Sequence, residues 1–179
     1  MRTPSRRRLF VLLCPLLCWS CASVAPAPPA KEEPATIFLV RHAEKASEAN
    51  DAPLSETGRE RARTLARVLG EAGIETIYTT EYVRNIETAK PLADALRITP
   101  AVIPAADLDA LAARLRAIPP GGATLVVSHP DRLPLIGQKL GVRIPEVAHT
   151  EFDRLTIVTL SKESASARIL RYGAPSAPR

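Results

Sequence analysis

The sequence predicts an α/β domain, a three-layer sandwich in which a mostly parallel central sheet carries helices on both faces. Two observations lead to this fold class. Short apolar runs rich in β-branched residues alternate with segments in which apolar residues recur at helical spacing, a pattern typical of parallel sheets covered by helices. In addition, two of the apolar runs end directly in polar clusters, as strands do where the carboxyl edge of a sheet binds a ligand.

The elements follow in order along the chain. The first expected strand, residues 36–40, reads TIFLV. The helix after it has Ser55 or Thr57 as its N-cap and is ended by Gly70 and Gly73. A second helix has an apolar face from Ile86 to Leu96, and Pro91 is expected to kink or interrupt it. The remaining expected strands are residues 74–80, 98–103, 123–127, 152–160 and 167–172, and the remaining expected helices are residues 107–117 and 131–140.

Residues 1–21 have the layout of a secretory signal. Four arginines and no acidic residue precede Cys21, and the apolar run at residues 9–17 is too short to span a bilayer comfortably. Leaving out these four arginines lowers the formal net charge from +5 to about +1, so the rest of the chain is close to neutral. There is no basic stripe with interleaved aromatic residues, which argues against nucleic acid as a partner.

All three cysteines lie in this segment, so the body of the protein has no thiol for a disulfide or a metal site. The pair Ser20-Cys21 resembles the end of a bacterial lipoprotein signal, in which Cys21 is acylated; ordinary signal cleavage after Ala22 is the alternative. Four prolines and no apolar periodicity between Cys21 and the first strand indicate a disordered tether. The expected organisation is a signal peptide of the lipoprotein type at 1–21, a Pro-rich tether at 22–35, the α/β domain at 36–173 and a disordered tail at 174–179.

Polar side chains follow three of the expected strands. Arg41 and His42 come directly after the first, Arg84 lies about a turn beyond the second, and His129 follows the strand at 123–127. Because parallel strands point their carboxyl ends to the same edge, we expect these four side chains to converge on one crevice. Arginine binds phosphate through paired, charge-assisted hydrogen bonds, and a neutral imidazole is a competent nucleophile toward phosphorus. The set therefore predicts an anion site that contains a nucleophile.

In these motifs the chain resembles the histidine phosphatase superfamily, also called phosphoglycerate mutase-like. The matching pieces are the first strand with Arg41-His42-Ala43-Glu44-Lys45, the helix opening Leu54-Ser55-Glu56-Thr57-Gly58-Arg59, the run Thr80-Glu81-Tyr82-Val83-Arg84 with Thr88-Ala89, and Val127-Ser128-His129. They occur in the family's order over residues 36–160. The chain departs from the family pattern at Ala43, where many members have Gly, and at Pro130-Asp131, where one branch has an acid directly after the histidine. It also has no long insertion that could form a lid.

The resemblance implies a mechanism. His42 is the expected nucleophile, which takes up the phosphoryl group as a phosphohistidine, while Arg41, Arg84 and His129 hold its oxygens. Water then releases phosphate. The family usually protonates the leaving group with a carboxylic acid, for which Asp107 is our first choice ahead of Asp131. Asp107 also begins an expected helix, so an N-cap is the competing interpretation.

Several other polar residues have two interpretations. Lys45 and Glu44 are candidate substrate contacts, or else a solvated pair in the loop. His149 belongs to no motif and is expected to be structural. A metal site built from His42, Glu44, His129 and Asp131 is disfavoured, because two arginines in the same crevice would repel a divalent cation; we expect neither a metal nor another cofactor.

The sequence therefore predicts a metal-independent phosphomonoester hydrolase that acts on a small phosphorylated substrate. Two alternatives stay open: a non-catalytic phosphate- or phosphosugar-binding module of the cell envelope, and a phosphoprotein phosphatase or mutase of the same family. We expect an extracytoplasmic protein, either a bacterial envelope lipoprotein held in the membrane through Cys21 or a secreted or periplasmic one. The sequence indicates no particular oligomeric state.

Overall fold

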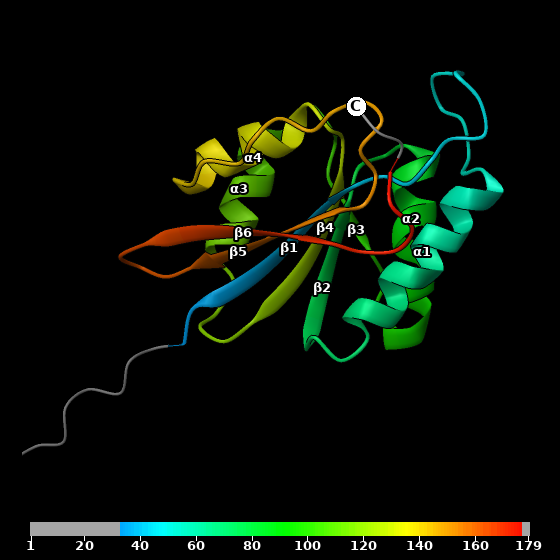
Figure 1. Ribbon diagram of the computed structural model, residues 1–179. Coiled ribbons are helices and arrows are strands. Elements are labelled where there is room, and N and C mark those ends of the chain that lie inside the picture. Colours follow the sequence, from blue (N-terminus) through cyan, green and yellow to red (C-terminus); the bar gives the residue numbers. More distant parts are fainter. Residues whose placement is uncertain (1–32, 177–179) are drawn as a thin grey trace, which may run out of the picture. The chain divides into compact units, whose positions relative to one another are not determined.

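The computed structural model describes residues 33–176, in which a six-stranded sheet lies between two pairs of helices (Figure 1). The expected signal and Cys21 lie outside the described residues. The strands are β1 (Ala35–Arg41), β2 (Ile74–Thr79), β3 (Ala101–Val102), β4 (Ala123–Ser128), β5 (Arg154–Leu160) and β6 (Ala165–Arg171), and the helices are α1 (Glu56–Leu69), α2 (Val83–Leu96), α3 (Leu108–Arg116) and α4 (Arg132–Leu140). None of these helices is long and apolar enough to cross a membrane.

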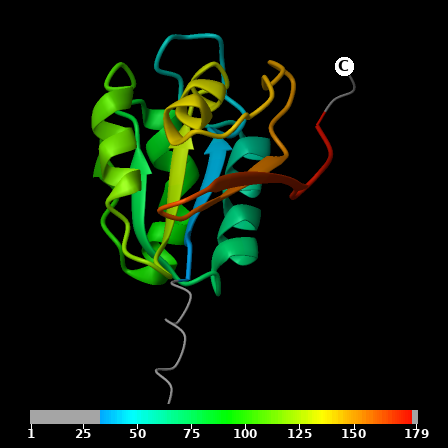
Figure 2. The same cartoon turned by 90° about the vertical axis from the view of Figure 1, so that its left-hand side faces the viewer.

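The sheet has the strand order β3-β2-β4-β1-β5-β6. Its first four strands are parallel, and β5 and β6 continue it as antiparallel strands on the other side of β1. Arg41 at the end of β1 is in register with Ser128 at the end of β4, so the next residues, His42 and His129, follow neighbouring strand ends. Figure 2 shows β1 and β4 side by side and pointing the same way. The expected mostly parallel α/β sheet is confirmed.

The side chains of β1 alternate between the two faces of the sheet, which decides where each pair of helices packs. Phe38 and Val40 belong to a core with α1 and α2, whereas Ile37 and Leu39 belong to a second core with α3 and α4. Figure 1 shows the two pairs of helices on opposite sides of the sheet. Because β1 is buried on both faces, its last residue, Arg41, and His42 directly after it are held by a rigid support.

Two helices have the N-cap residues that were expected from the sequence. Ser55 is the N-cap of α1, and its hydroxyl accepts a hydrogen bond of 3.1 Å from the amide of Gly58. Asp107 is the N-cap of α3, and its carboxylate accepts one of 2.9 Å from the amide of Ala110. Both bonds satisfy amides that the helix itself leaves without a partner.

The structure corrects two expectations about the helices and strands. Helix α2 continues through Pro91 without interruption, because Ala89, Leu92 and Ala93 on both sides of it are packed into the core. Strand β3 is only two residues long rather than the expected six, since only Ala101 and Val102 pair with β2.

The domain boundaries also differ from those expected. Ala35, assigned to the tether, is the first residue of β1 and pairs with β5. At the other end, Ser176 is ordered rather than part of a disordered tail. Its hydroxyl accepts hydrogen bonds from the amides of Phe152 and Asp153 at 2.7 and 3.0 Å. The folded domain therefore extends beyond both expected limits.

Candidate active site

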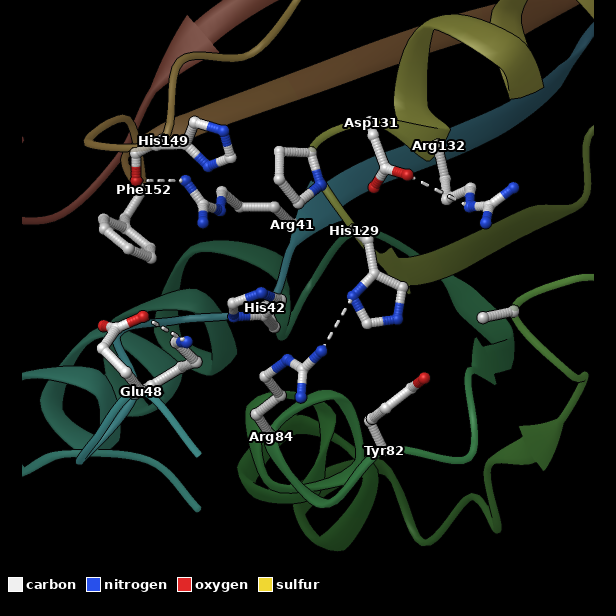
Figure 3. A pocket seen from close by; sticks show the side chains of 13 residues that line it. Arg41, His42, Glu48, Tyr82, Arg84, His129, Asp131, Arg132, His149 and Phe152 are labelled. Carbon is white, nitrogen blue, oxygen red and sulfur yellow. Dashed lines mark hydrogen bonds and ion pairs between the residues drawn. The ribbon is translucent and has the colours of Figure 1, made fainter. Parts of the chain in front are cut away.

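A pocket of about 530 Å³ lies at the carboxyl edge of the sheet, where β1 and β4 end. Figure 3 shows side chains from several loops pointing into it. The lining residues are Arg41, His42, Lys45, Glu48, Tyr82, Arg84, Ala105, His129, Pro130, Asp131, Arg132, His149 and Phe152. The expected convergence of Arg41, His42, Arg84 and His129 is what the structure shows.

Arg41 is held along one edge by backbone carbonyls. Its Nη1 donates to the carbonyl oxygens of Ala148, His149 and Glu151 at 3.0, 2.8 and 3.2 Å, and the ring of Phe152 lies 3.9 Å from the guanidinium carbon. Its Nε is buried and has no hydrogen-bond partner among residues 33–176. Burial lowers the pKa of Arg41 to about 10, which still leaves it charged at neutral pH. A buried cation with an unused donor is suited to an anionic ligand.

His42 is positioned by the main chain on both sides. Its amide donates to the carbonyl of Ser128 at 2.9 Å, and its Nδ1 lies 2.8 Å from the carbonyl oxygen of Ala43. A carbonyl only accepts, so Nδ1 carries the proton and Nε2 carries the lone pair. Burial lowers the pKa of His42 to about 3, and the charges of Arg41 and Arg84 act in the same direction. The imidazole is therefore neutral over the physiological range.

Arg84 and His129 bind each other on the far side of His42. Arg84 lies at the start of α2, where its Nη1 donates to the carbonyl of Asn50 at 2.6 Å and its Nη2 lies 3.4 Å from Nδ1 of His129. Since arginine only donates, Nδ1 accepts, and the proton of His129 lies on Nε2, 3.2 Å from the hydroxyl of Thr80. Burial and the charge of Arg84 lower the pKa of His129 to about 4. The two imidazole rings are 5.6 Å apart, centre to centre.

A buried hydroxyl links the two arms of the site. Thr88 in α2 accepts a hydrogen bond from the amide of Ala43 at 2.9 Å and donates one to the carbonyl of Arg84 at 2.7 Å. It therefore connects the backbone that orients His42 with the residue that supplies the second guanidinium.

Lys45 and Glu44 have different surroundings. Lys45 lines the pocket and forms an ion pair with the exposed Glu48 at 3.0 Å. The carboxylate of Glu44 lies outside the pocket lining and is bound by the buried Arg61, whose Nη2 is 2.7 Å away. The alternative, a pair between Glu44 and Lys45, is absent among the ion pairs of the described residues. Of the two candidate substrate contacts, only Lys45 lines the pocket.

The two candidate acids are also separated. Asp131 lines the pocket, at the start of α4, and pairs with Arg132 at 3.3 Å. Asp107 lies outside the lining of this pocket and accepts a bond from its own helix instead, so the capping interpretation is correct. The structure reverses our order of preference, because a proton donor must reach the reacting group.

The pocket wall also contains polar residues that were not expected there. His149, which we interpreted as structural, and Arg132, which we did not single out, both line the pocket. Figure 3 shows His149 near Arg41 and Phe152, and Arg132 beside Asp131. Arg132 follows a strand end closely enough for the sequence to have indicated it. His149 carries no such signal, because it reaches the pocket through an irregular loop. Within residues 33–176 there is no group of three His, Cys, Asp or Glu side chains that could hold a metal ion.

Comparisons with known proteins agree with this geometry. The family model described as the histidine phosphatase superfamily (branch 1) matches residues 37–109, which include Arg41, His42 and Arg84. No curated protein sequence matches the chain.

Solved structures share the fold. The protein histidine phosphatase SixA, solved with tungstate, is 21% identical with a TM-score of 0.56, over 78% of this chain and 97% of its own. A protein from Escherichia coli K-12, provisionally assigned as an alpha-ribazole-5'-P phosphatase, is 16% identical with a TM-score of 0.61, over 76% and 96% of the two chains. A mycobacterial glucosyl-3-phosphoglycerate phosphatase is 18% identical with a TM-score of 0.55, over 78% and 99%.

The sequence motifs, the sheet order and the four converging side chains thus agree with the family match and with the fold of these structures. The resemblance seen in the sequence is confirmed: the histidine phosphatase superfamily model matches residues 37–109, and the chain shares the fold of solved phosphatases.

Proposed function

We propose that the protein hydrolyses phosphomonoesters through a phosphohistidine on His42, without a resident metal. The observation that carries the proposal is the hydrogen bond between Nδ1 of His42 and the carbonyl of Ala43. This bond fixes the proton on Nδ1 and leaves the lone pair on Nε2. The pKa of about 3 keeps the ring neutral, so the nucleophile needs no prior deprotonation at neutral pH.

The two guanidiniums supply the charge that the phosphoryl group requires. Arg41 and Arg84 each have a buried Nε without a protein partner, and both line the pocket with His42. Donors held in place before the reaction stabilise the charge spread over the phosphoryl oxygens in the transition state. The negative charge of bound phosphate opposes the effect of burial and of Arg84 on the pKa of His129.

The reaction has two steps. Nε2 of His42 forms a bond to phosphorus while the bond from phosphorus to the ester oxygen breaks, and the leaving oxygen takes a proton. Water then attacks the phosphohistidine, its proton returns to the solvent or to the same acid, and inorganic phosphate and neutral His42 remain. Asp131 is the proposed acid, because Asp131 and Glu48 are the only carboxylate side chains in the described lining and only Asp131 lies close to His129 in the chain, two residues beyond it.

The mechanism can be tested by finding which histidine becomes phosphorylated, because the chain has few histidines. The sequence has three, His42, His129 and His149, and all three line the pocket. Brief reaction with a ³²P-labelled phosphomonoester and acid-free quenching should label the peptide that contains His42. His42→Ala should abolish both label and turnover. His149→Ala, which removes an exposed imidazole of the same pocket, should keep the label on His42. Label on another histidine, or full turnover by His42→Ala, contradicts the mechanism.

A substrate panel separates this proposal from its alternatives. It should contain p-nitrophenyl phosphate, sugar phosphates, phosphoglycerates and a protein phosphorylated on histidine, because the similar structures carry names of such different phosphatases. Phosphate binding without turnover would indicate a binding module, and isomerisation of phosphoglycerate faster than its hydrolysis would indicate a mutase. Activity lost in EDTA and restored by zinc or magnesium would refute the metal-free mechanism.

We further propose that the protein is an envelope lipoprotein anchored through Cys21. The basic amino end, the apolar run and the proline-rich residues before β1 support this placement. One acyl chain binds a membrane only marginally, so a stable anchor needs the additional chains of a lipoprotein. Cys21→Ser should move the protein from the membrane fraction to the soluble extracytoplasmic fraction. If the wild-type protein is already soluble there, export stands and the lipid anchor does not.

A further inference from the structure

A cluster of charged residues around a buried carboxylate adjoins the loop whose carbonyls hold Arg41. Its centre is Glu151, which is 4% exposed and whose carboxylate is bound by two arginines. Arg154 donates to it through Nε and Nη2, both at 2.8 Å, and Arg171 contacts it at 2.6 Å. Burial alone would raise the pKa of Glu151, but these bonds and one from the amide of Ala148 lower it below its ordinary value.

The cluster shapes the loop whose carbonyls hold Arg41. The carboxylate of Glu151 accepts a hydrogen bond from the amide of Ala148 at 3.3 Å, and the amide of Glu151 donates one to the carbonyl of Ala148 at 2.9 Å. Two hydrogen bonds between the same two residues therefore close the turn. Arg154 in turn donates from Nη1 to the carbonyl of Pro145 at 2.9 Å and ties down the start of the loop. The three carbonyls that bind Nη1 of Arg41 belong to this turn.

We propose that Glu151, fixed by Arg154, is a positioning residue of the active site, which acts by holding Arg41 in its phosphate-binding orientation. The carbonyls of the turn accept the hydrogen bonds of Nη1, whereas the buried Nε has no partner among the described residues and can donate to a ligand. The negative charge of Glu151 also opposes the loss of charge that burial imposes on Arg41. The inference rests on the proposed function in one respect only, that Arg41 binds the phosphoryl group.

A double-mutant cycle between Glu151 and Arg41, made in the full chain, tests the proposal. Glu151→Gln keeps the size of the side chain and removes its charge. It should lower kcat/KM for p-nitrophenyl phosphate about 10- to 100-fold and weaken inhibition by phosphate by a similar factor. In an Arg41→Ala background the same substitution should change either quantity less than about 2-fold, since nothing remains to be positioned. Equal factors in the two backgrounds would overturn the proposal.

A neighbouring residue provides the matched control. Asp153 is also buried and also pairs with Arg171, at 2.8 Å, but within the described residues its carboxylate forms no hydrogen bond or ion pair with residues 148–151, the turn that binds Arg41. Asp153→Asn should therefore lower the melting temperature while kcat/KM per folded molecule stays within about 2-fold of wild type. If it lowers kcat/KM as much as Glu151→Gln does, the cluster supports only the fold and the proposal fails.

Two further measurements keep the result interpretable. If Glu151→Gln does not fold, Arg154→Lys, which loses the paired bonds to Glu151 and keeps the charge, replaces it in the same cycle with the same expected outcome. The affinity for inorganic phosphate, measured by calorimetry, is read in parallel because it needs no turnover. Coupling in phosphate affinity without any hydrolysis would refute the proposed function and support the positioning role. Absence of phosphate binding by the wild-type chain would overturn both.

Discussion

Acid should destabilise the fold through the two histidines at the bottom of the pocket. Burial lowers the pKa of His42 to about 3 and that of His129 to about 4, whereas an unfolded histidine has a pKa of about 6.5. Between these values the unfolded chain binds protons that the folded chain does not. The free energy of unfolding is therefore undiminished above about pH 6.5 and falls as the pH falls, until each folded-state pKa is reached.

The size of the loss follows from the difference between the pH and the pKa of an unfolded histidine. At pH 5 the pH is about 1.5 units below that pKa, which lowers the free energy of unfolding by about 2 kcal/mol for each residue and by about 4 kcal/mol for His42 and His129 together. That is a large share of the roughly 5–15 kcal/mol that stabilises an ordinary domain. The buried carboxylates Glu151 and Asp153, whose pKa values are lowered, lose their contribution in a more acidic range, below about pH 4.5.

Urea unfolding at pH 7 and pH 5, in buffer free of phosphate, measures this loss. His42→Gln should reduce the difference between the two pH values by about 2 kcal/mol, because the variant lacks one of the two titrating groups. The exposed His149 provides the control, and His149→Gln should leave the difference as in the wild type. A difference that is unchanged in His42→Gln would show that His42 is not kept neutral by the fold, and the assignment of its lone pair would lose its basis.

Three further substitutions probe the support of the site and its acid. A Cβ at Gly58 would lie 2.3 Å from the carbonyl oxygen of Glu44, so Gly58→Ala should lower the free energy of unfolding by about 1–3 kcal/mol and reduce turnover; an unchanged urea midpoint would contradict the contact. Thr88→Val leaves a buried amide without its acceptor and should cost about 1–3 kcal/mol, with kcat reduced more than KM is raised; equal effects on both would indicate a purely structural hydroxyl. Asp131→Asn should slow an alkyl phosphate far more than p-nitrophenyl phosphate, whereas Asp107→Asn should affect both substrates alike; the opposite pattern would return the role of acid to Asp107.

The parts of the site that could be predicted from the sequence are those that depend on local order. Arg41 and His42 extend β1, and His129 follows β4, so the rule that parallel strands end at one edge was enough to bring them together. Ser55 could be identified as a cap because a cap acts on its own helix, three residues away.

The parts that could not be predicted depend on contacts between distant segments. Glu44 stands two residues beyond His42, yet its carboxylate is bound by Arg61 from α1, and no pattern near Glu44 indicates this pairing. His149 and the carbonyls that hold Arg41 come from a loop more than a hundred residues further along the chain. The continuation of α2 through Pro91 likewise depends on tertiary packing, which outweighs the local preference.

The position of β1 in the sheet bears on when the protein can become active during synthesis. The strand that leads to His42 is made early, but its two neighbours, β4 and β5, pair with it from positions that begin at Ala123 and Arg154. Contacts of this range form slowly, and a ribosome that has released only the first hundred residues has released His42 without either strand that supports it. The proposed phosphoryl transfer therefore requires β4 and β5, and a nascent fragment that ends before β5 carries His42 without an assembled site.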